Sequence, residues 1–184
     1  MMYYKYYRYD DDDNLLKYIQ EKYNLNSVNK YLFSTLVASH DNWGQRGIIS
    51  DEVEKYGEIK YAGKFRNNTK IGKRTEDKIE YISKGVFNIC PENSKSEGYW
   101  TEKIFQAFEA GTIPIYWGEG IPEPKIINEN KYCLCNLGDI QKSISDVMNN
   151  KESYIKGPLF KDTAIEEMKQ LYSDLKNSLT NLLK

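Results

Sequence analysis

Hydrophobic positions along the chain change their spacing repeatedly, and the changes predict alternating strands and helices. Continuous apolar runs of strand length suit parallel strands that are buried on both faces. The expected strands are 31–38, 58–61, 85–90, 112–117 and 132–136, of which 58–61 is a short segment. Between these strands, and after the last of them, apolar residues recur every three or four positions, which is typical of amphipathic helices. The expected helices are 46–56, 75–83, 101–110 and 140–149.

This alternation predicts an α/β protein with a parallel sheet and helices on both of its faces. Ligands of such sheets bind beyond the carboxyl ends of the strands. Three loops fall at that edge, and we expect them to converge on one crevice. They are residues 39–46, 62–68 and 91–101.

The two ends of the chain differ from this central region. Residues 1–30 are expected to form an N-terminal extension with one helix at 14–23, and residues 31–160 a single ligand-binding domain. Residues 161–184 predict a long amphipathic helix, because apolar residues recur along one face. These residues are Ile165, Met168, Leu171, Leu175, Leu179 and Leu182.

Composition narrows the function classes. The net charge of −1 and a pI near 6.0 give no electrostatic reason to expect a nucleic-acid partner. The N-terminal MMYYKYYRYDDDD lacks the apolar core of a signal peptide, and no apolar run has the length of a transmembrane segment. We therefore expect a location in the cytoplasm or at the periphery of a membrane.

Cysteine and histidine usage bears on metal and redox chemistry. Cys90, Cys133 and Cys135 are an odd number of widely spaced thiols, which indicates free cysteines in a reducing compartment. We expect them to be small buried side chains on strands. With His40 as the single histidine, the sequence predicts no metal site.

Residues 87–118 contain the candidate chemistry, because they predict a strand, a polar loop, a helix and a further strand. Thr101 is placed to cap the helix, and Gly111 suits its C′ position. A helix N-terminus binds anions through its unpaired N–H groups and its dipole. The chain has no dinucleotide glycine fingerprint and no GxxxxGK[ST] loop, which disfavours NAD and ATP. The segment therefore predicts a ligand that carries phosphate.

Two cations are candidates for the phosphate. Lys103 lies in the first turn of this helix, where the dipole disfavours a cation, so it needs a compensating anion. A phosphate would serve, and so would pairing with Glu97 or Glu102. Arg46 lies at a strand-to-helix junction, and its bidentate fork suits a second phosphate contact.

Three further polar residues leave alternatives open. Glu102 suits the first turn of a helix, and it could equally accept hydrogen bonds from a ribose diol. Asn93 follows Pro91 and Glu92, where asparagine is commonly a turn residue. Tyr99 could stack on a nucleotide, although a chain with 16 tyrosines offers simpler explanations.

The segment 86–118 resembles the signature of the α-1,3-fucosyltransferases of glycosyltransferase family 10. The matching words are FNICPENS, GYWTEKIFQAF and GTIPIYWG. Upstream, VASHDNWGQR places Arg46 seven residues after Ser39, as in the family's donor-binding element, and YAGKFRNN is similar to the next one. Downstream, YCLCNLGDI also resembles the family. The resemblance covers roughly residues 30–160.

This resemblance implies a GT-B fold, of which residues 31–160 would be the C-terminal, Rossmann-like domain that binds GDP-fucose. By resemblance, Arg46 and Lys103 bind the pyrophosphate, Glu102 holds a sugar hydroxyl, and Asn93 and Tyr99 line the nucleotide-sugar pocket. Fucose would pass from GDP-β-L-fucose to an N-acetylglucosamine-containing oligosaccharide with inversion, and without a metal cofactor.

The resemblance also implies a division of labour. The family's general base is a carboxylate of an N-terminal, acceptor-binding domain, and residues 1–30 are too short for such a domain. We therefore expect this chain to lack the base. It could be a donor domain that works with a complementing acceptor domain, or a small transferase that completes its acceptor site as a homo-oligomer. An inactive GDP-sugar-binding module and a transferase of another sugar are further alternatives.

Overall fold

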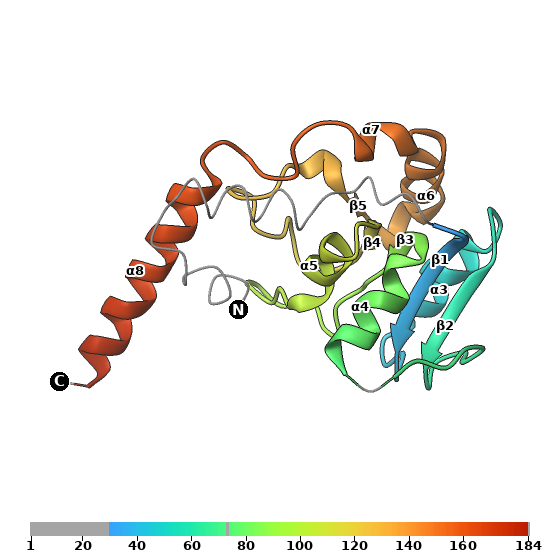
Figure 1. The fold of residues 1–184 in the computed structure, drawn as a ribbon, viewed down its shortest axis with the longest axis horizontal. Coiled ribbons are helices and arrows are strands. Elements are labelled where there is room, and N and C mark those ends of the chain that lie inside the picture. The colour runs from blue at the N-terminus through green and yellow to red at the C-terminus, as the bar shows by residue number, and fades with distance from the viewer. Residues whose placement is uncertain (1–29, 73, 184) are drawn as a thin grey trace.

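A five-stranded parallel sheet is the centre of the molecule (Figure 1). The computed structural model describes residues 30–72 and 74–183. The strands are β1 Leu32–Ala38, β2 Ile59–Gly63, β3 Gly85–Ile89, β4 Ile113–Tyr116 and β5 Cys133–Leu134. They lie in the order β2-β1-β3-β4-β5, and every neighbouring pair is parallel.

The strand order reverses direction between β1 and β3. From β1 the chain proceeds to β2 on one side of the sheet and then returns to β3 on the other side. The loops that follow β1 and β3 therefore lead to opposite sides of the sheet and leave a crevice at the carboxyl edge. The register pairs Leu36 of β1 with Ile89 of β3 close to that edge.

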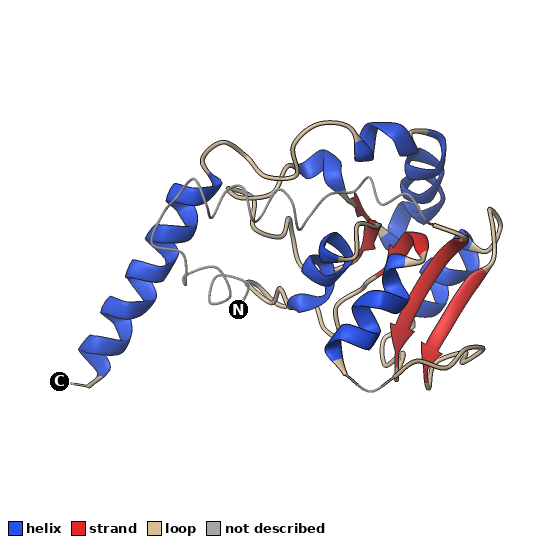
Figure 2. Cartoon of the chain, in the orientation of Figure 1, coloured by secondary structure: helices blue, strands red, loops and turns tan. Residues whose placement is uncertain are grey.

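Helices cover both faces of the sheet (Figure 2). On one face, α3 Gln45–Val53 and α6 Ile140–Asn149 pack on the strands through a shared apolar cluster that includes Ile49 and Ile144. On the other face lie α4 Thr75–Ser83 and α5 Glu102–Glu109. Because parallel strands are buried on both faces, their sequences read as apolar runs. The predicted fold class is confirmed.

The predicted boundaries hold best where sequence signals are local. Helices α4 and α6 begin and end at the predicted residues, and α5 ends before Gly111, whose φ of 66° suits the C′ position. Strand β5 is shorter than predicted, with two residues in the ladder. Three short elements were not expected: η1 Glu129–Lys131, η2 Leu137–Asp139 and α7 Lys151–Ile155.

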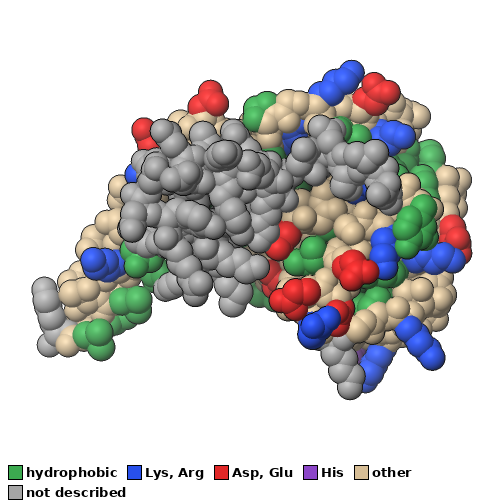
Figure 3. All heavy atoms as spheres, viewed as in Figure 1, with side chains coloured by type: hydrophobic (Ala, Val, Ile, Leu, Met, Phe, Trp, Pro, Cys, Tyr) green, Lys and Arg blue, Asp and Glu red, His purple; other side chains and the backbone are tan. Residues whose placement is uncertain are grey.

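The C-terminal helix α8 Ala164–Leu182 extends away from the sheet (Figure 1). Its first turns pack on the core through Ala164 and Met168, both buried, whereas Leu175 and Leu179 are exposed. Hydrophobic side chains are visible along the outer end of this helix in Figure 3. The predicted apolar face therefore exists, and within the described part of the chain its buried residues lie in the first turns. The helix expected at 14–23 lies outside the described residues.

Candidate functional site

A small cavity lies at the carboxyl edge of the sheet, between the ends of β1 and β3. Its volume is about 20 Å³, which is room for about one water molecule. The strand ends contribute Ala38 and Asn88, and three cationic side chains line it from three different helices. These cations are Arg46 at the start of α3, Lys78 of α4 and Lys103 of α5. The cavity thus lies at the reversal of strand order, where the sequence predicted a crevice.

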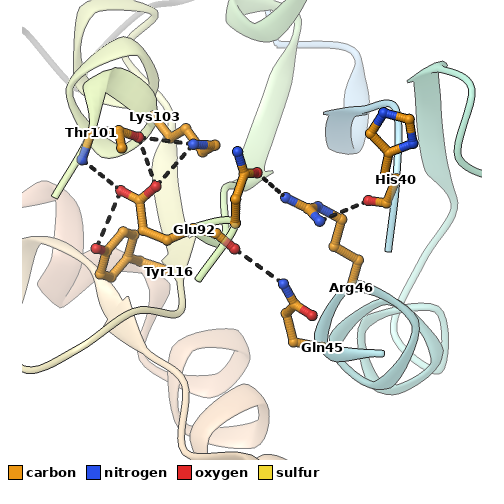
Figure 4. A network of polar contacts seen from close by, with 8 residues as sticks. His40, Gln45, Arg46, Glu92, Thr101, Lys103 and Tyr116 are labelled. Atoms are coloured by element: carbon orange, nitrogen blue, oxygen red, sulfur yellow. Dashed lines mark hydrogen bonds and ion pairs between the residues drawn. The ribbon is translucent and has the colours of Figure 1, made fainter. Parts of the chain in front are cut away.

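Beside this cavity, the buried carboxylate of Glu92 organises the start of α5 (Figure 4). Glu92 Oε1 accepts hydrogen bonds from the backbone N–H of Thr101 at 2.8 Å and, more weakly, from the Tyr116 hydroxyl at 3.4 Å. Glu92 Oε2 accepts from Thr101 Oγ1 at 2.7 Å and from Lys103 Nζ at 2.9 Å. Four donors thus use the acceptor capacity of the ionised carboxylate.

The compensating anion for Lys103 is therefore Glu92, rather than the predicted Glu97 or Glu102. Lys103 Nζ also donates to Thr101 Oγ1 at 2.8 Å, and its side chain is 19% exposed. An ammonium has three N–H donors, so one remains for a ligand. Thr101 is the N-cap residue of α5, as predicted, but its hydroxyl donates to Glu92 and makes no side-chain cap bond.

Arg46 is held by backbone and side-chain acceptors on two loops. Its Nη1 donates to the His40 carbonyl oxygen at 2.7 Å, and its Nη2 donates to Asn93 Oδ1 at 2.8 Å. Burial lowers the pKa of Arg46, whereas the nearby carboxylates of Asp41 and Glu92 act to raise it. The guanidinium has five N–H groups, so these two bonds leave three for a ligand.

The N-terminus of α3 already has an anion of its own. The carboxylate of Asp41 accepts from the backbone N–H of Arg46 at 2.9 Å and from that of Gly47 at 2.8 Å. These bonds satisfy two of the first-turn N–H groups that would otherwise lack partners. A ligand at Arg46 is therefore bound by the side chain rather than by this helix end.

Two of the three predicted loops meet at the cavity. Gln45 Nε2 donates to the Glu92 carbonyl oxygen at 3.1 Å, and Arg46 contacts Asn93, so residues 39–46 and 91–101 are joined twice. The loop 62–68 contributes no described residue to the cavity wall, but it contacts the end of β1 and helix α3. Phe65 N–H donates to the Ala38 carbonyl oxygen, and Arg66 pairs with Asp51 of α3 at 2.6 Å.

The remaining predicted residues are not among the described residues that line the cavity. Asn93 is exposed and reaches the site through Arg46. Tyr99 is half-buried, with a backbone N–H that bonds to the Ser96 carbonyl. Glu102 is exposed in the first turn of α5 and forms no side-chain hydrogen bond or ion pair within the described ranges. Burial lowers the pKa of Lys78, and the charge of Glu102 acts against that shift.

Sequence reasoning missed two central residues. Glu92 was visible as a polar loop residue, but nothing in the local pattern indicated that its carboxylate would be buried. Lys78 lies on α4, twenty-five positions before Lys103, and only the packing of α4 beside α5 brings it to the cavity. Both assignments depend on tertiary contacts, which periodicity does not report.

The arrangement suits the binding of an anion better than nucleophilic chemistry. Cys90 lines the cavity, but burial raises the pKa of its thiol, and a thiol is a weak nucleophile. All three cysteines are free and buried, as expected. Within residues 30–72 and 74–183, no cluster of three His, Cys, Asp or Glu residues suits a metal, and no helix has the length and apolarity to cross a membrane.

Comparison with known proteins gives one family. A family model described as glycosyltransferase family 10 (fucosyltransferase), C-terminal, matches residues 25–156. The chain is 38% identical over 86 residues to the α-(1,3)-fucosyltransferase FucT of Helicobacter pylori, a match that covers 47% of this chain and 18% of that protein.

Solved structures give the same result. A crystal structure of α1,3-fucosyltransferase with GDP-fucose matches with a TM-score of 0.57 and 25% identity. One with GDP matches with a TM-score of 0.59 and the same identity. Each match covers 84% of this chain and 52% of the other. The chain therefore spans about half the length of these structures.

Proposed function

Because the chain belongs to glycosyltransferase family 10, the fucosyltransferases, we propose that it binds GDP-fucose at the cavity between β1 and β3. It is the donor-binding, Rossmann-like half of a GT-B enzyme that transfers L-fucose to an N-acetylglucosamine-containing glycan. The linkage is α-1,3, and the anomeric configuration inverts. The observation that carries this proposal is the placement of Arg46 and Lys103, from the first turns of two separate helices, in the wall of one cavity.

In this proposal, Arg46 and Lys103 hold the diphosphate. Among the contacts that the described residues make, three N–H groups of Arg46 and one of Lys103 are not used. Charge-assisted bonds of this kind are the strong ones, and the planar guanidinium matches two phosphate oxygens at once. The two side chains are held in place before a ligand binds, so little conformational entropy is lost on binding.

The other predicted residues take the sugar and the nucleotide. Glu102, exposed in the first turn of α5 next to Lys103, accepts hydrogen bonds from a fucose hydroxyl. Asn93 and Tyr99, on the loop between β3 and α5, line the nucleotide-sugar pocket. Asn93 keeps its amide N–H₂ group for this purpose, because its Oδ1 is occupied by Arg46.

The chemistry is a single displacement at the anomeric carbon. The acceptor oxygen forms the new bond as the bond from that carbon to the diphosphate oxygen breaks, and GDP leaves with the bonding electrons. The acceptor's proton passes to a base that we assign to no residue of this chain. Arg46 and Lys103 stabilise the charge that develops on the leaving group, so the protein needs no metal for this step.

Glu92 is excluded as that base by its environment. Its carboxylate is fully buried and already accepts from four donors. This observation favours a second candidate function, in which the chain binds a GDP-sugar without transferring it. Incubation of the chain with GDP-fucose and an N-acetyllactosamine acceptor separates the two candidates. Fucosylated product supports the transferase, and donor binding without product supports the binding module.

Titration calorimetry with GDP tests the site itself. We expect the 184-residue chain to bind GDP, and Lys103→Ala to bind it about tenfold more weakly, as the loss of one charge-assisted bond implies. Lys95→Ala is the matched control, since Lys95 lies in the same loop and is 56% exposed in a surface pair with Glu119. Equal GDP affinity in wild type and Lys103→Ala would sink the assigned site. Preference for GDP-mannose over GDP-fucose would instead point to another sugar.

A further inference from the structure

Among the described cations of the cavity wall, Lys78 is the one for which the sequence predicted no role. It comes from α4, whereas Arg46 and Lys103 come from the starts of α3 and α5. Gln106, one turn after Lys103, lines the same cavity. The packing of α4 against α5 thus adds a cation to the site from a third helix.

The surroundings of Lys78 do not satisfy its charge. In residues 30–72 and 74–183 its ammonium has no hydrogen-bond acceptor and no ion-pair partner, although Arg46 and Lys103 have both acceptors and nearby carboxylates. Burial lowers the pKa of Lys78, and the charge of Lys103 lowers it further, whereas Glu102 and Glu92 raise it. A half-buried cation without an acceptor costs stability, so a role beyond folding would explain its place.

A second group in the cavity also lacks a partner. Gln106 Oε1 is buried and accepts no hydrogen bond within the described part of the chain. An amide can present either its oxygen or its N–H₂ group by turning over. With the N–H₂ group turned inward, Gln106 and Lys78 would both donate to one acceptor between them.

We infer that Lys78 is a third cationic ligand of the donor's diphosphate and reaches it from the α4 side of the cavity. This inference rests on the proposed function. The cavity volume of about 20 Å³ admits about one oxygen-sized group, such as a single phosphate oxygen. That oxygen would accept from Lys78 and Gln106, while the rest of the diphosphate lies against Arg46 and Lys103.

This placement predicts which state of the ligand Lys78 favours. Cleavage of the bond to the sugar leaves the bonding electrons on the diphosphate, which gains one negative charge. A cation aimed at that charge stabilises GDP more than the intact nucleotide sugar. Lys78 is therefore expected to contribute more to the binding of GDP than to that of GDP-fucose, and nothing to that of guanosine.

Calorimetry on the full chain with GDP, GDP-fucose and guanosine tests the inference. We expect Lys78→Met to weaken GDP binding about tenfold, with a smaller loss for GDP-fucose and no change for guanosine. Lys84→Met is the matched control, since Lys84 lies at the end of the same helix and pairs with Glu80. Lys78→Arg, which keeps the charge, should recover part of the affinity.

The thermal midpoint of each variant separates binding from folding. Removal of an unsatisfied charge should leave the midpoint of Lys78→Met at or above that of the wild type, whereas a structural role would lower it. Equal GDP affinity in wild type and Lys78→Met overturns this inference alone. A loss of guanosine affinity in Lys78→Met as large as its loss of GDP affinity does so too. A wild-type chain that binds no GDP overturns the proposed function and this inference together.

Discussion

The carboxylate of Glu92 and the ammonium of Lys103 lie 2.9 Å apart and join the loop after β3 to the first turn of α5. The pair resolves the conflict between Lys103 and the helix dipole, because Glu92 supplies the negative charge that this helix end favours. It also fixes Lys103 against the cavity wall. The carboxylate of Glu92 thus stabilises the start of α5 and also positions Lys103, the proposed phosphate-binding residue.

Glu92→Gln should therefore destabilise the fold and also weaken the binding of GDP. An amide of the same shape keeps some hydrogen bonds but leaves Lys103 without its counter-ion. We expect a loss of about 3 kcal/mol in the free energy of unfolding, the lower end for a broken buried pair, because Lys103 keeps some contact with water. Urea unfolding measures this value. Glu97→Gln is the control, because Glu97 is exposed in the same loop. If Glu97→Gln weakened GDP binding as much as Glu92→Gln, the proposal that Glu92 positions Lys103 would be contradicted.

Arg46→Lys separates the geometry of the cation from its charge. Lysine keeps the positive charge but loses the planar fork, which bonds to His40 and Asn93 and leaves three donors free. We expect about tenfold weaker GDP binding by calorimetry. Arg66→Lys is the control, since Arg66 pairs with Asp51 outside the cavity. If Arg46→Lys bound GDP like the wild type, charge alone would suffice and the fork would have no role.

The parts of the fold that follow from local chemistry could be predicted from the sequence. Helix α5 shows this best: its apolar spacing places Ile104 and Phe108 in the core, and Gly111 ends it. The α8 face was predicted just as clearly, yet Leu175 and Leu179 are exposed. Periodicity reports that a helix has an apolar face, but not what packs against that face.

The residues of the candidate site also fall into two groups, those that the sequence identified and those that it did not. Arg46 and Lys103 could be named from motif position, and the structure brings both to one cavity. Glu92 could not be named as their organiser, since its burial depends on Tyr116 of β4 and Thr101 closing around it. Lys78 required the packing of α4 on α5. Contacts between segments distant in sequence were thus the part that no local pattern supplied.

Lys30 should give the stability of the fold a measurable pH dependence. It donates to the Gly85 carbonyl oxygen, and burial lowers its pKa from 10.5 to about 8. Between those values the unfolded chain binds the proton and the folded chain releases it, so stability rises with pH from about 8 to 10.5. After a discount for partial contact with water, we expect a gain of about 2 kcal/mol.

Urea unfolding at pH 7, 8, 9 and 10 checks this gain by comparing wild type with Lys30→Met. The stability of the wild type relative to Lys30→Met should rise with pH, because only the wild type carries the buried charge at low pH. Tyrosine ionisation near pH 10 affects both proteins and cancels in the comparison. Lys55→Met, at a lysine that is 57% exposed, is the control for the loss of a surface lysine. A stability difference between wild type and Lys30→Met that stays constant with pH would contradict a lowered pKa.

Gly63→Ala should damage both the fold and the cavity. Gly63 ends β2 with a φ of 97°, and a Cβ there would overlap the carbonyl oxygen of Ala38, its partner in the ladder. That carbonyl is fixed by a hydrogen bond from Phe65 N–H, so it cannot move aside freely. We expect a loss of about 3 kcal/mol from the strained backbone and the overlap together.

Gly120→Ala separates the cost of the backbone strain from the cost of the overlap with Ala38. Gly120 has a φ of 65° and open space where a Cβ would lie, so its substitution should cost only the backbone strain, about 1 kcal/mol. Urea unfolding of both variants measures the difference. Because Ala38 lines the cavity, Gly63→Ala should also weaken GDP binding, whereas Gly120→Ala should not. Equal losses of stability in the two variants would mean that the end of β1 moves to accommodate the added methyl group. The cavity wall would then be less rigid than the close approach of β1 and β2 implies.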